Sequence, residues 1–267
     1  MTKVSQWTTP DGQQLAYREL GDRRDPAIVL VHGLFSSSRS WDQIGPELAA
    51  GGRWVIMPDL RGHGESAKAA SYRFSDLAAD LGSLLDHLEL SVVDLVGHSL
   101  GGQVVSQIAQ QQPDRVRTLV LEDAPPPPVL GDRYKGPGLR ELPVRSRVML
   151  VTFLALRYRW VKRHVDINMA KSILAEFRRP DPQWWTDLAK IAAPTLILHG
   201  GPESHVPGRR LSDMTALIVR SEMVTLPVGH RVHNHAPEAY LRHVCALLDS
   251  ASSPPDAAGT ATAITQS

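Results

Sequence analysis

The stretch Gly97-His98-Ser99-Leu100-Gly101-Gly102 decides the fold, because its first five residues fit the pattern G-x-S-x-G. An apolar run over 92–96 precedes it and a helical pattern begins near Gln103, which indicates a sharp strand-to-helix turn. The glycines at 97 and 101 fit such a turn, since side chains there would collide with neighbouring backbone. The turn exposes the Ser99 hydroxyl in front of a helix N-terminus, which favours negative charge. We therefore predict a nucleophilic Ser99, although a serine in a chance glycine-rich turn would match the same five letters.

Short apolar runs recur on both sides of this turn and are typical of strands buried on both faces of a sheet. They cover 27–32, 54–57, 92–96, 118–121, 195–198 and 223–226. Helical patterns alternate with them at 75–88, 104–109 and 236–248. Two further strands, at 4–8 and 15–20, flank the turn signal Pro10-Asp11-Gly12 and indicate an antiparallel start. The fold class is therefore α/β, with a mainly parallel sheet flanked by helices.

The rhythm of strands and helices breaks between about 130 and 190. Several Gly and Pro residues are followed there by a helical pattern without a strand. We expect an α/β core over 1–129 and 191–249, and a small helical cap over 130–190 that lies above the carboxyl edge of the sheet. The last segment, 250–267, consists of small and polar residues, and we expect it to be disordered.

Composition excludes several classes of partner. The 29 basic and 28 acidic side chains leave a net charge of +1, which gives no reason to expect binding to nucleic acid. Cys245 is the single cysteine, so no internal disulfide can form. No stretch has the pattern of a signal peptide or of a stable membrane insertion. We expect a cytoplasmic enzyme with a small-molecule substrate; the oligomeric state stays open.

Two further stretches make the family resemblance plain. Val31-His32-Gly33 follows a buried strand, and the loop Pro58-Asp59-Leu60-Arg61-Gly62-His63-Gly64-Glu65-Ser66 is characteristic of one superfamily. Together with the turn around Ser99, they resemble the α/β-hydrolase superfamily over nearly the whole ordered chain. The resemblance implies an eight-stranded sheet and an oxyanion hole. The hole would use the N–H groups of Leu100 and Leu34, with Phe35 as the fallback for Leu34.

The resemblance also places the general base after the last strand. Leu226-Pro227-Val228-Gly229-His230 lies there, so His230 is the expected base, in the superfamily order nucleophile, acid, histidine. His233 and His235 follow closely, and a metal cluster is the alternative explanation for three neighbouring histidines. We expect no metal and no organic cofactor, because no further ligand set joins them in the sequence. His63, His98, His233 and His235 are expected to be neighbours of the site.

The acid that orients the histidine is the point where the sequence departs from the family pattern. Glu203 stands in the loop after the penultimate strand, where relatives often carry Asp, but it is one methylene longer and follows Gly200-Gly201-Pro202. Asp123 fits a second acid position, at the end of the strand that follows the nucleophile helix. We favour Asp123 and keep Glu203 as the alternative. A strand-end cap for Asp123 and a solvated loop charge for Glu203 are the non-catalytic interpretations.

These residues predict a serine hydrolase that acts on an ester, lactone or thioester of a medium-sized, fairly apolar substrate. The expected cap carries aromatic and basic side chains, which would either line a pocket or form an ordinary apolar underside and solvated outer face. Three alternatives stay open. They are carbon–carbon bond cleavage or cofactor-free haloperoxidase and perhydrolase activity, a lyase or cyclase on the same fold, and a non-catalytic binding protein.

Overall fold

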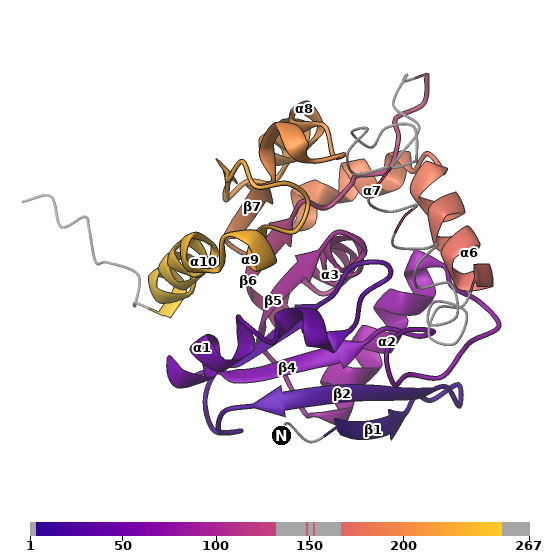
Figure 1. Cartoon of the computed structure of the whole chain (residues 1–267), viewed down its shortest axis with the longest axis vertical. Helices are drawn as coiled ribbons and strands as arrows, with labels where there is room; N and C mark the ends of the chain where they lie inside the picture. The colour runs from indigo at the N-terminus through magenta and orange to yellow at the C-terminus, as the bar shows by residue number, and fades with distance from the viewer. Residues whose placement is uncertain (1–3, 132–147, 149–151, 153–166, 253–267) are drawn as a thin grey trace, which may run out of the picture.

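A computed structural model describes residues 4–131, 148, 152 and 167–252. Eight strands form one sheet in the order β1-β2-β4-β3-β5-β6-β7-β8 (Figure 1). The pairs β1/β2 and β2/β4 are antiparallel, and every later pair is parallel. The predicted α/β sheet, mostly parallel with an antiparallel start, is confirmed.

The strands are β1 (Val4–Thr8), β2 (Gln14–Leu20), β3 (Ala27–Val31), β4 (Trp54–Asp59), β5 (Val93–His98), β6 (Val116–Glu122), β7 (Thr195–His199) and β8 (Ser221–Thr225). The α-helices are α1 (Gly45–Ala50), α2 (Phe74–His87), α3 (Leu100–Gln111), α6 (Ile167–Arg178), α7 (Pro182–Asp187), α8 (Gly208–Leu217), α9 (Val232–His235) and α10 (Pro237–Ser252). Four 3₁₀ turns complete the described elements: η1 (Ser38–Trp41), η2 (Pro113–Arg115), η3 (Leu188–Lys190) and η4 (Gly201–Glu203).

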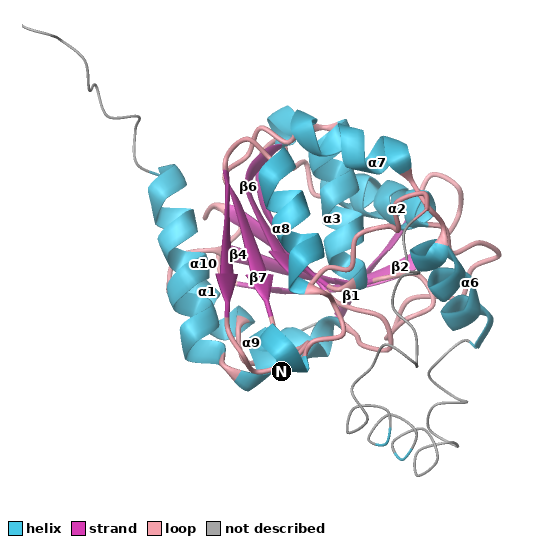
Figure 2. Cartoon of the chain, turned by 90° about the horizontal axis from the view of Figure 1, so that it is seen from above, coloured by secondary structure: helices cyan, strands magenta, loops and turns pink. Residues whose placement is uncertain are grey.

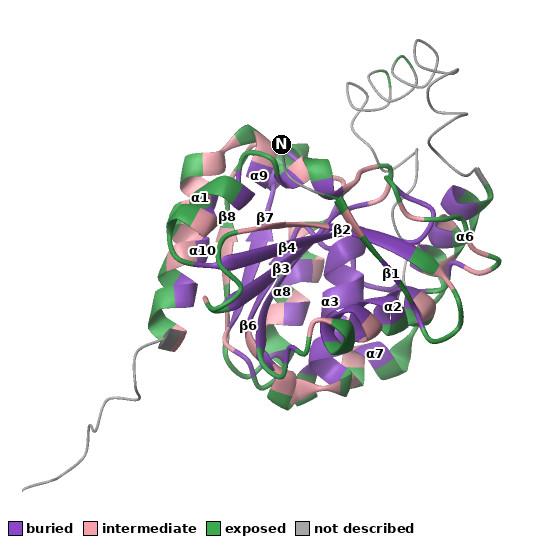
Figure 3. Cartoon of the chain, turned by 90° about the horizontal axis from the view of Figure 1, so that it is seen from below, coloured by how far each residue is buried: buried purple, intermediate pink, exposed green. Residues whose placement is uncertain are grey.

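Helices cover both faces of the sheet. Helices α2, α3 and α8 lie on one face, and α1 and α10 lie on the other (Figure 2). Side chains of a strand point alternately to the two faces, so Val29 and Val31 join one core cluster while Ile28 and Leu30 join the other. The inner strands β3, β4 and β5 are buried along their whole length, whereas the edge strand β1 is partly exposed (Figure 3).

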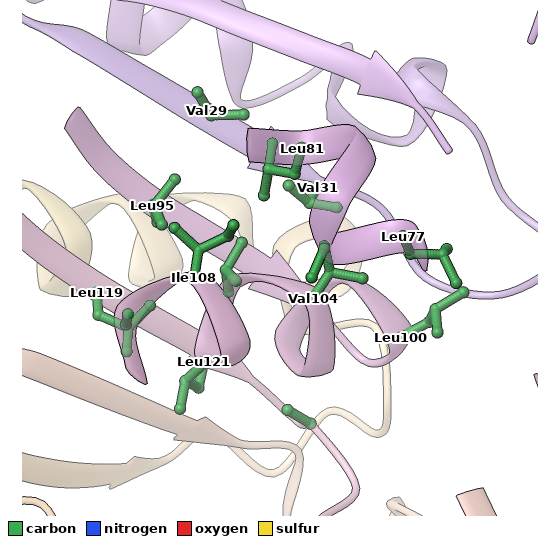
Figure 4. Close-up of a cluster of buried hydrophobic side chains, with 14 of the residues drawn as sticks. Val29, Val31, Leu77, Leu81, Leu95, Leu100, Val104, Ile108, Leu119 and Leu121 are labelled. Atoms are coloured by element: carbon green, nitrogen blue, oxygen red, sulfur yellow. The ribbon is translucent and has the colours of Figure 1, made fainter. Parts of the chain in front are cut away.

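Helix α3 fixes the position of the nucleophile turn. Its side chains Leu100, Val104 and Ile108 are buried in one cluster with Leu95 of β5 and Leu119 of β6 (Figure 4). All five are at most 1% exposed, which anchors both the strand before the turn and the helix after it. The turn between them is therefore held from both sides by close-packed apolar contacts.

The described part of the expected cap packs on the face that carries α2 and α3. Phe177 of α6 contacts Phe74 of α2 edge to face, with 4.9 Å between ring centroids. Trp184 of α7 is buried and donates from Nε1 to the hydroxyl of Ser106 in α3 at 3.2 Å. Trp184 is therefore a core residue here. The other expected cap residues, 132–147, 149–151 and 153–166, lie outside the described residues, so the cap and its boundaries stay a prediction. At the other end, α10 continues through Ser252, beyond residue 250 where we expected the tail to begin.

Candidate active site

The carboxyl ends of β5 and β6 bring Ser99 next to Glu122. Ser99 follows β5 directly, and its backbone N–H donates to the carbonyl of Glu122 at the end of β6 (2.9 Å). Ser99 has a φ of 53°, in the left-handed region that a side chain rarely adopts. A Cβ at Gly101 would lie 2.1 Å from the carbonyl oxygen of Val31, and one at Gly97 would lie 2.4 Å from the carbonyl oxygen of Gly101. Glycine is thus sterically required on both sides of Ser99.

Asp123 and His230 are joined at this edge. The Nδ1 atom of His230 lies 2.7 Å from Oδ2 of Asp123, a carboxylate with 0% side-chain exposure. Asp123 also accepts from the N–H of Gly200 (2.9 Å) and from the hydroxyl of Ser204. With Nδ1 donating to Asp123, Nε2 of His230 has no hydrogen-bond partner among the described residues. It is therefore the nitrogen that can accept a proton.

Glu203, the alternative acid, has a different environment. Its side chain is exposed, and no hydrogen bond or ion pair within the described residues joins it to His230. The preceding Gly201 has a φ of +74° and opens the turn η4, which contains Glu203. The loop after β7 approaches His230 instead through Ser204, which contacts Asp123, and through His205. The ring of His205 lies 3.9 Å from that of His230, centroid to centroid.

The loop after β3 lies against the nucleophile turn. A Cβ built on Gly33 would be 3.2 Å from Cβ of Ser99, so this loop passes directly beside the serine. The N–H groups of Leu34 and Leu100 have no hydrogen-bond partner among the described residues. For Leu100 this follows from its place as the first residue of α3. Phe35, the fallback donor, has a φ of 62° and an N–H that is also without a partner there.

The imidazoles at the site are held in their neutral forms. Burial, reinforced by the charge of Arg231, lowers the pKa of His230 to about 3. Burial and the adjacent His230 lower the pKa of His205 to about 3 as well. Burial raises the pKa of the Asp123 carboxyl, while the hydrogen bonds from Gly200 and Ser204 oppose that shift. A neutral His230 is the form that can take a proton from a hydroxyl.

A second carboxylate–histidine pair lies behind the first. His233 of α9 points Nδ1 at both carboxylate oxygens of Glu122 (2.8 and 2.7 Å), and its backbone N–H donates to the same carboxylate at 3.0 Å. Both side chains have 0% exposure. His98 donates from Nε2 to the carbonyl oxygen of His230 at 2.9 Å. Burial raises the pKa of Glu122 to about 7 and lowers that of His233 to about 3.

The sequence prediction missed part of this arrangement. Glu122, Ser204 and His205 had no predicted role. Two consecutive carboxylates at a strand end, followed later by His230 and His233, are the signal that could have suggested paired contacts. In the described part of the chain, no three His, Cys, Asp or Glu side chains are placed to hold a metal ion. No helix there is both long and apolar enough to span a bilayer.

Comparisons with known proteins find similarity to one family model, to curated relatives and to solved structures. Residues 26–143 match the model of the family described as the alpha/beta hydrolase fold. The sn-1-specific diacylglycerol lipase of Mus musculus is 27% identical and covers 88% of this chain and 85% of its own. A non-heme haloperoxidase of Rhodococcus erythropolis is 30% identical, with 83% and 90% covered. The crystal structure of a hydrolase from Pseudomonas aeruginosa is 26% identical and superposes with a TM-score of 0.77, covering 92% of this chain and 98% of that one.

Proposed function

The chain belongs to the α/β-hydrolase superfamily, and from this premise we propose that it is a serine hydrolase with Ser99 as nucleophile. His230 is its general base and Asp123 the acid that orients that base. One observation carries the proposal: Nδ1 of His230 donates to the buried Asp123 at 2.7 Å, at the sheet edge where Ser99 stands in its strained turn. This leaves Nε2 available as the proton acceptor.

The proposed reaction begins with attack of Ser99 Oγ on the substrate carbonyl carbon. His230 takes the hydroxyl proton on Nε2, and Asp123 stabilises the imidazolium that forms. The carbonyl oxygen becomes an oxyanion and accepts hydrogen bonds from the N–H groups of Leu100 and Leu34. Each such donor contributes about 3 kcal/mol to transition-state stabilisation. Collapse of the tetrahedral intermediate expels the alcohol or thiol, which takes the proton from His230.

The second half of the reaction releases the acyl group. A water molecule gives its proton to His230 and attacks the acyl-enzyme, and Ser99 leaves as the alcohol. The Ser99 turn also places the N-terminus of the twelve-residue helix α3 behind the nucleophile, which favours the negative charge in both steps. Apart from the substrate and one water molecule, these steps use side chains and backbone groups of the chain itself.

The substrate class we propose is an ester, lactone or thioester of medium size with an apolar part. Phe35 is 40% exposed on the loop that passes beside Ser99, and it offers an apolar surface for such a substrate. The partly buried Leu34 flanks it. The similarity to a lipase and to a hydrolase of known structure agrees with this class of reaction.

The proposal is tested by labelling the purified protein with a fluorophosphonate and measuring its intact mass. We expect one adduct on the wild type, none on Ser99→Ala, and labelling slowed by at least about 10³-fold in His230→Ala. Ser106→Ala is the matched control, because Ser106 lies in α3 and bonds to Trp184 rather than to the site. It should label at the wild-type rate. An unlabelled but folded wild type would sink the proposal.

Perhydrolysis is a second candidate, favoured by the similarity to a haloperoxidase. Here hydrogen peroxide in place of water would attack an acetyl group on Ser99 and release peracetic acid, which oxidises halide. Halide oxidation that requires both acetate and peroxide, and that disappears in Ser99→Ala, would favour this candidate. Ester hydrolysis without such oxidation would exclude it.

A further inference from the structure

Two consecutive residues at the end of β6 bind two histidines of the following loop and helix. Asp123 binds His230, and Glu122 binds His233 through three contacts of 2.7–3.0 Å. Alternation along a strand directs Glu122 to the same face as Val120, in the cluster beneath α10. Trp41 and Tyr240 line that cluster, and Trp41 stacks on His233 at 4.2 Å. The second pair therefore lies inside the core, away from any substrate.

The loop that carries His230 is fixed on both sides of this residue. Before it, the N–H groups of Leu226 and Gly229 donate to the carbonyls of His199 and Gly200 at 2.9 and 2.8 Å. After it, the backbone N–H of His233 donates to Glu122 at 3.0 Å, and Asn234 donates from Nδ2 to the carbonyl of Ser40 at 3.1 Å. His98 holds the carbonyl oxygen of His230 itself. Of the two anchors after His230, Glu122 is the one nearer in sequence to the base, and it lies beside Asp123 at the end of β6.

We propose that Glu122 and His233, together with His98, are positioning residues that hold the His230 imidazole where its Nε2 can take the proton of Ser99. This proposal rests on the proposed serine-hydrolase function. The pair differs from ordinary core packing because both the backbone N–H and the Nδ1–H of His233 donate to one carboxylate. Loss of Glu122 would leave the N–H and Nδ1–H of His233 buried without acceptors, and α9 would shift to satisfy them. A shift of about 1 Å at His230 is enough to slow acylation by about 100-fold.

The test compares Glu122→Leu with Glu122→Gln in the full-length protein. Leucine removes the acceptor at similar volume, whereas glutamine keeps one acceptor oxygen, which can still bind both the N–H and the Nδ1–H of His233, and replaces the other oxygen with an amide NH2. Two quantities are measured below the unfolding temperature. One is the rate constant for fluorophosphonate labelling of Ser99. The other is the chemical shift and line width, in the low-field proton NMR spectrum, of the Nδ1 proton that His230 donates to Asp123.

We expect Glu122→Leu to label about 10- to 100-fold more slowly and to shift or broaden the resonance. Glu122→Gln should restore most of the rate and the wild-type resonance. Asp94→Asn is the matched control, since Asp94 is an equally buried carboxylate at the other end of β5. Its labelling rate and its resonance should equal those of the wild type.

A wild-type rate with an unmoved resonance in folded Glu122→Leu would overturn the proposal. Equal slowing in Asp94→Asn would also overturn it, because loss of any buried carboxylate would then suffice. If Glu122→Leu does not fold, His98→Phe tests the same loop through its other anchor, with slowed labelling expected. A wild type that is not labelled at all defeats the proposed function instead, and the resonance still reports whether Glu122 holds His230.

Discussion

The neighbouring strands β5 and β6 bury carboxylates at both of their ends, but the side chains that donate hydrogen bonds to these carboxylates differ between the two ends. Near the start of β5, Asp94 accepts hydrogen bonds from Arg53 (3.2 Å), Arg117 (2.9 Å) and Thr118 (2.8 Å). At the carboxyl ends, Asp123 and Glu122 accept from imidazoles. A guanidinium keeps its proton at any pH a protein meets, whereas an imidazole exchanges its proton near neutrality. The first cluster can only hold the sheet together, and the second can also do chemistry.

The largest effect is expected when Asp123, the carboxylate that binds His230, loses its charge. Asp123→Asn should lower kcat by about 10⁴-fold, because an amide can donate to Nδ1 and stabilise the wrong tautomer of His230. The assay is hydrolysis of a chromogenic ester, with circular dichroism to establish folding. Glu203→Gln makes the same change of charge on the exposed loop and should leave kcat unchanged within about twofold. If Glu203→Gln lowers kcat more than Asp123→Asn does, Glu203 and not Asp123 is the acid.

A substitution of Asp94, near the start of β5, should lower the stability of the protein and leave kcat unchanged. Asp94→Asn removes the buried carboxylate that binds the guanidiniums of Arg53 and Arg117, at 10% and 24% side-chain exposure, while Arg53 keeps its ion pair with Asp249 at 4.0 Å. We expect a loss of about 2–3 kcal/mol in the free energy of unfolding, below the ~3–5 kcal/mol of a fully buried pair because Arg117 retains some solvent. Urea denaturation measures this loss, and kcat should stay at the wild-type value. A fall in kcat in the folded variant would show that the two ends are coupled.

The smallest expected effect concerns Arg231, an exposed cation beside the base. The pKa of His230 is lowered below the ordinary 6.5, first by burial and then by the charge of Arg231. Activity needs the neutral imidazole, so the acid limb of kcat/KM should lie below pH 6.5. Arg231→Gln removes a charge that disfavours the imidazolium, and the limb should move to higher pH by about half a unit. The shift should shrink in high salt, and a limb that moves to lower pH would contradict this assignment.

Most of the sheet was predictable, because its strands are apolar runs flanked by turns. The ends were harder to place: β5 continues through His98 and β6 through Glu122, although both residues are polar. Apolar periodicity cannot detect such residues, whose side chains instead hydrogen-bond to His230 and His233. Helix α8 was also missed, since only Leu211 and Met214 of its ten residues are buried. Two apolar residues are too few to define a helical stripe.

The site was predictable in its residue types and less so in its pairing. Ser99 and His230 stand in local patterns that the sequence displays directly. Asp123 and Glu203 both follow strands at the same edge, so spacing alone could not separate them. The structure brings Asp123 to His230 because the loop after β7 turns at Gly201 and leaves Glu203 exposed. That outcome depends on loop conformation, which the order of residue types does not encode.

Among the residues that the structure describes, four non-glycine residues have a positive φ, and three of them lie at this edge: Phe35, Ser99 and Asp123, at 62°, 53° and 44°. Each such conformation costs on the order of 1–3 kcal/mol, and glycine would relieve much of it. For laboratory evolution, the most accessible gains in heat resistance therefore coincide with the residues proposed to perform or frame the reaction. A library selected for thermal survival alone would drift toward an inert, sturdier scaffold, so every round needs a screen for activity.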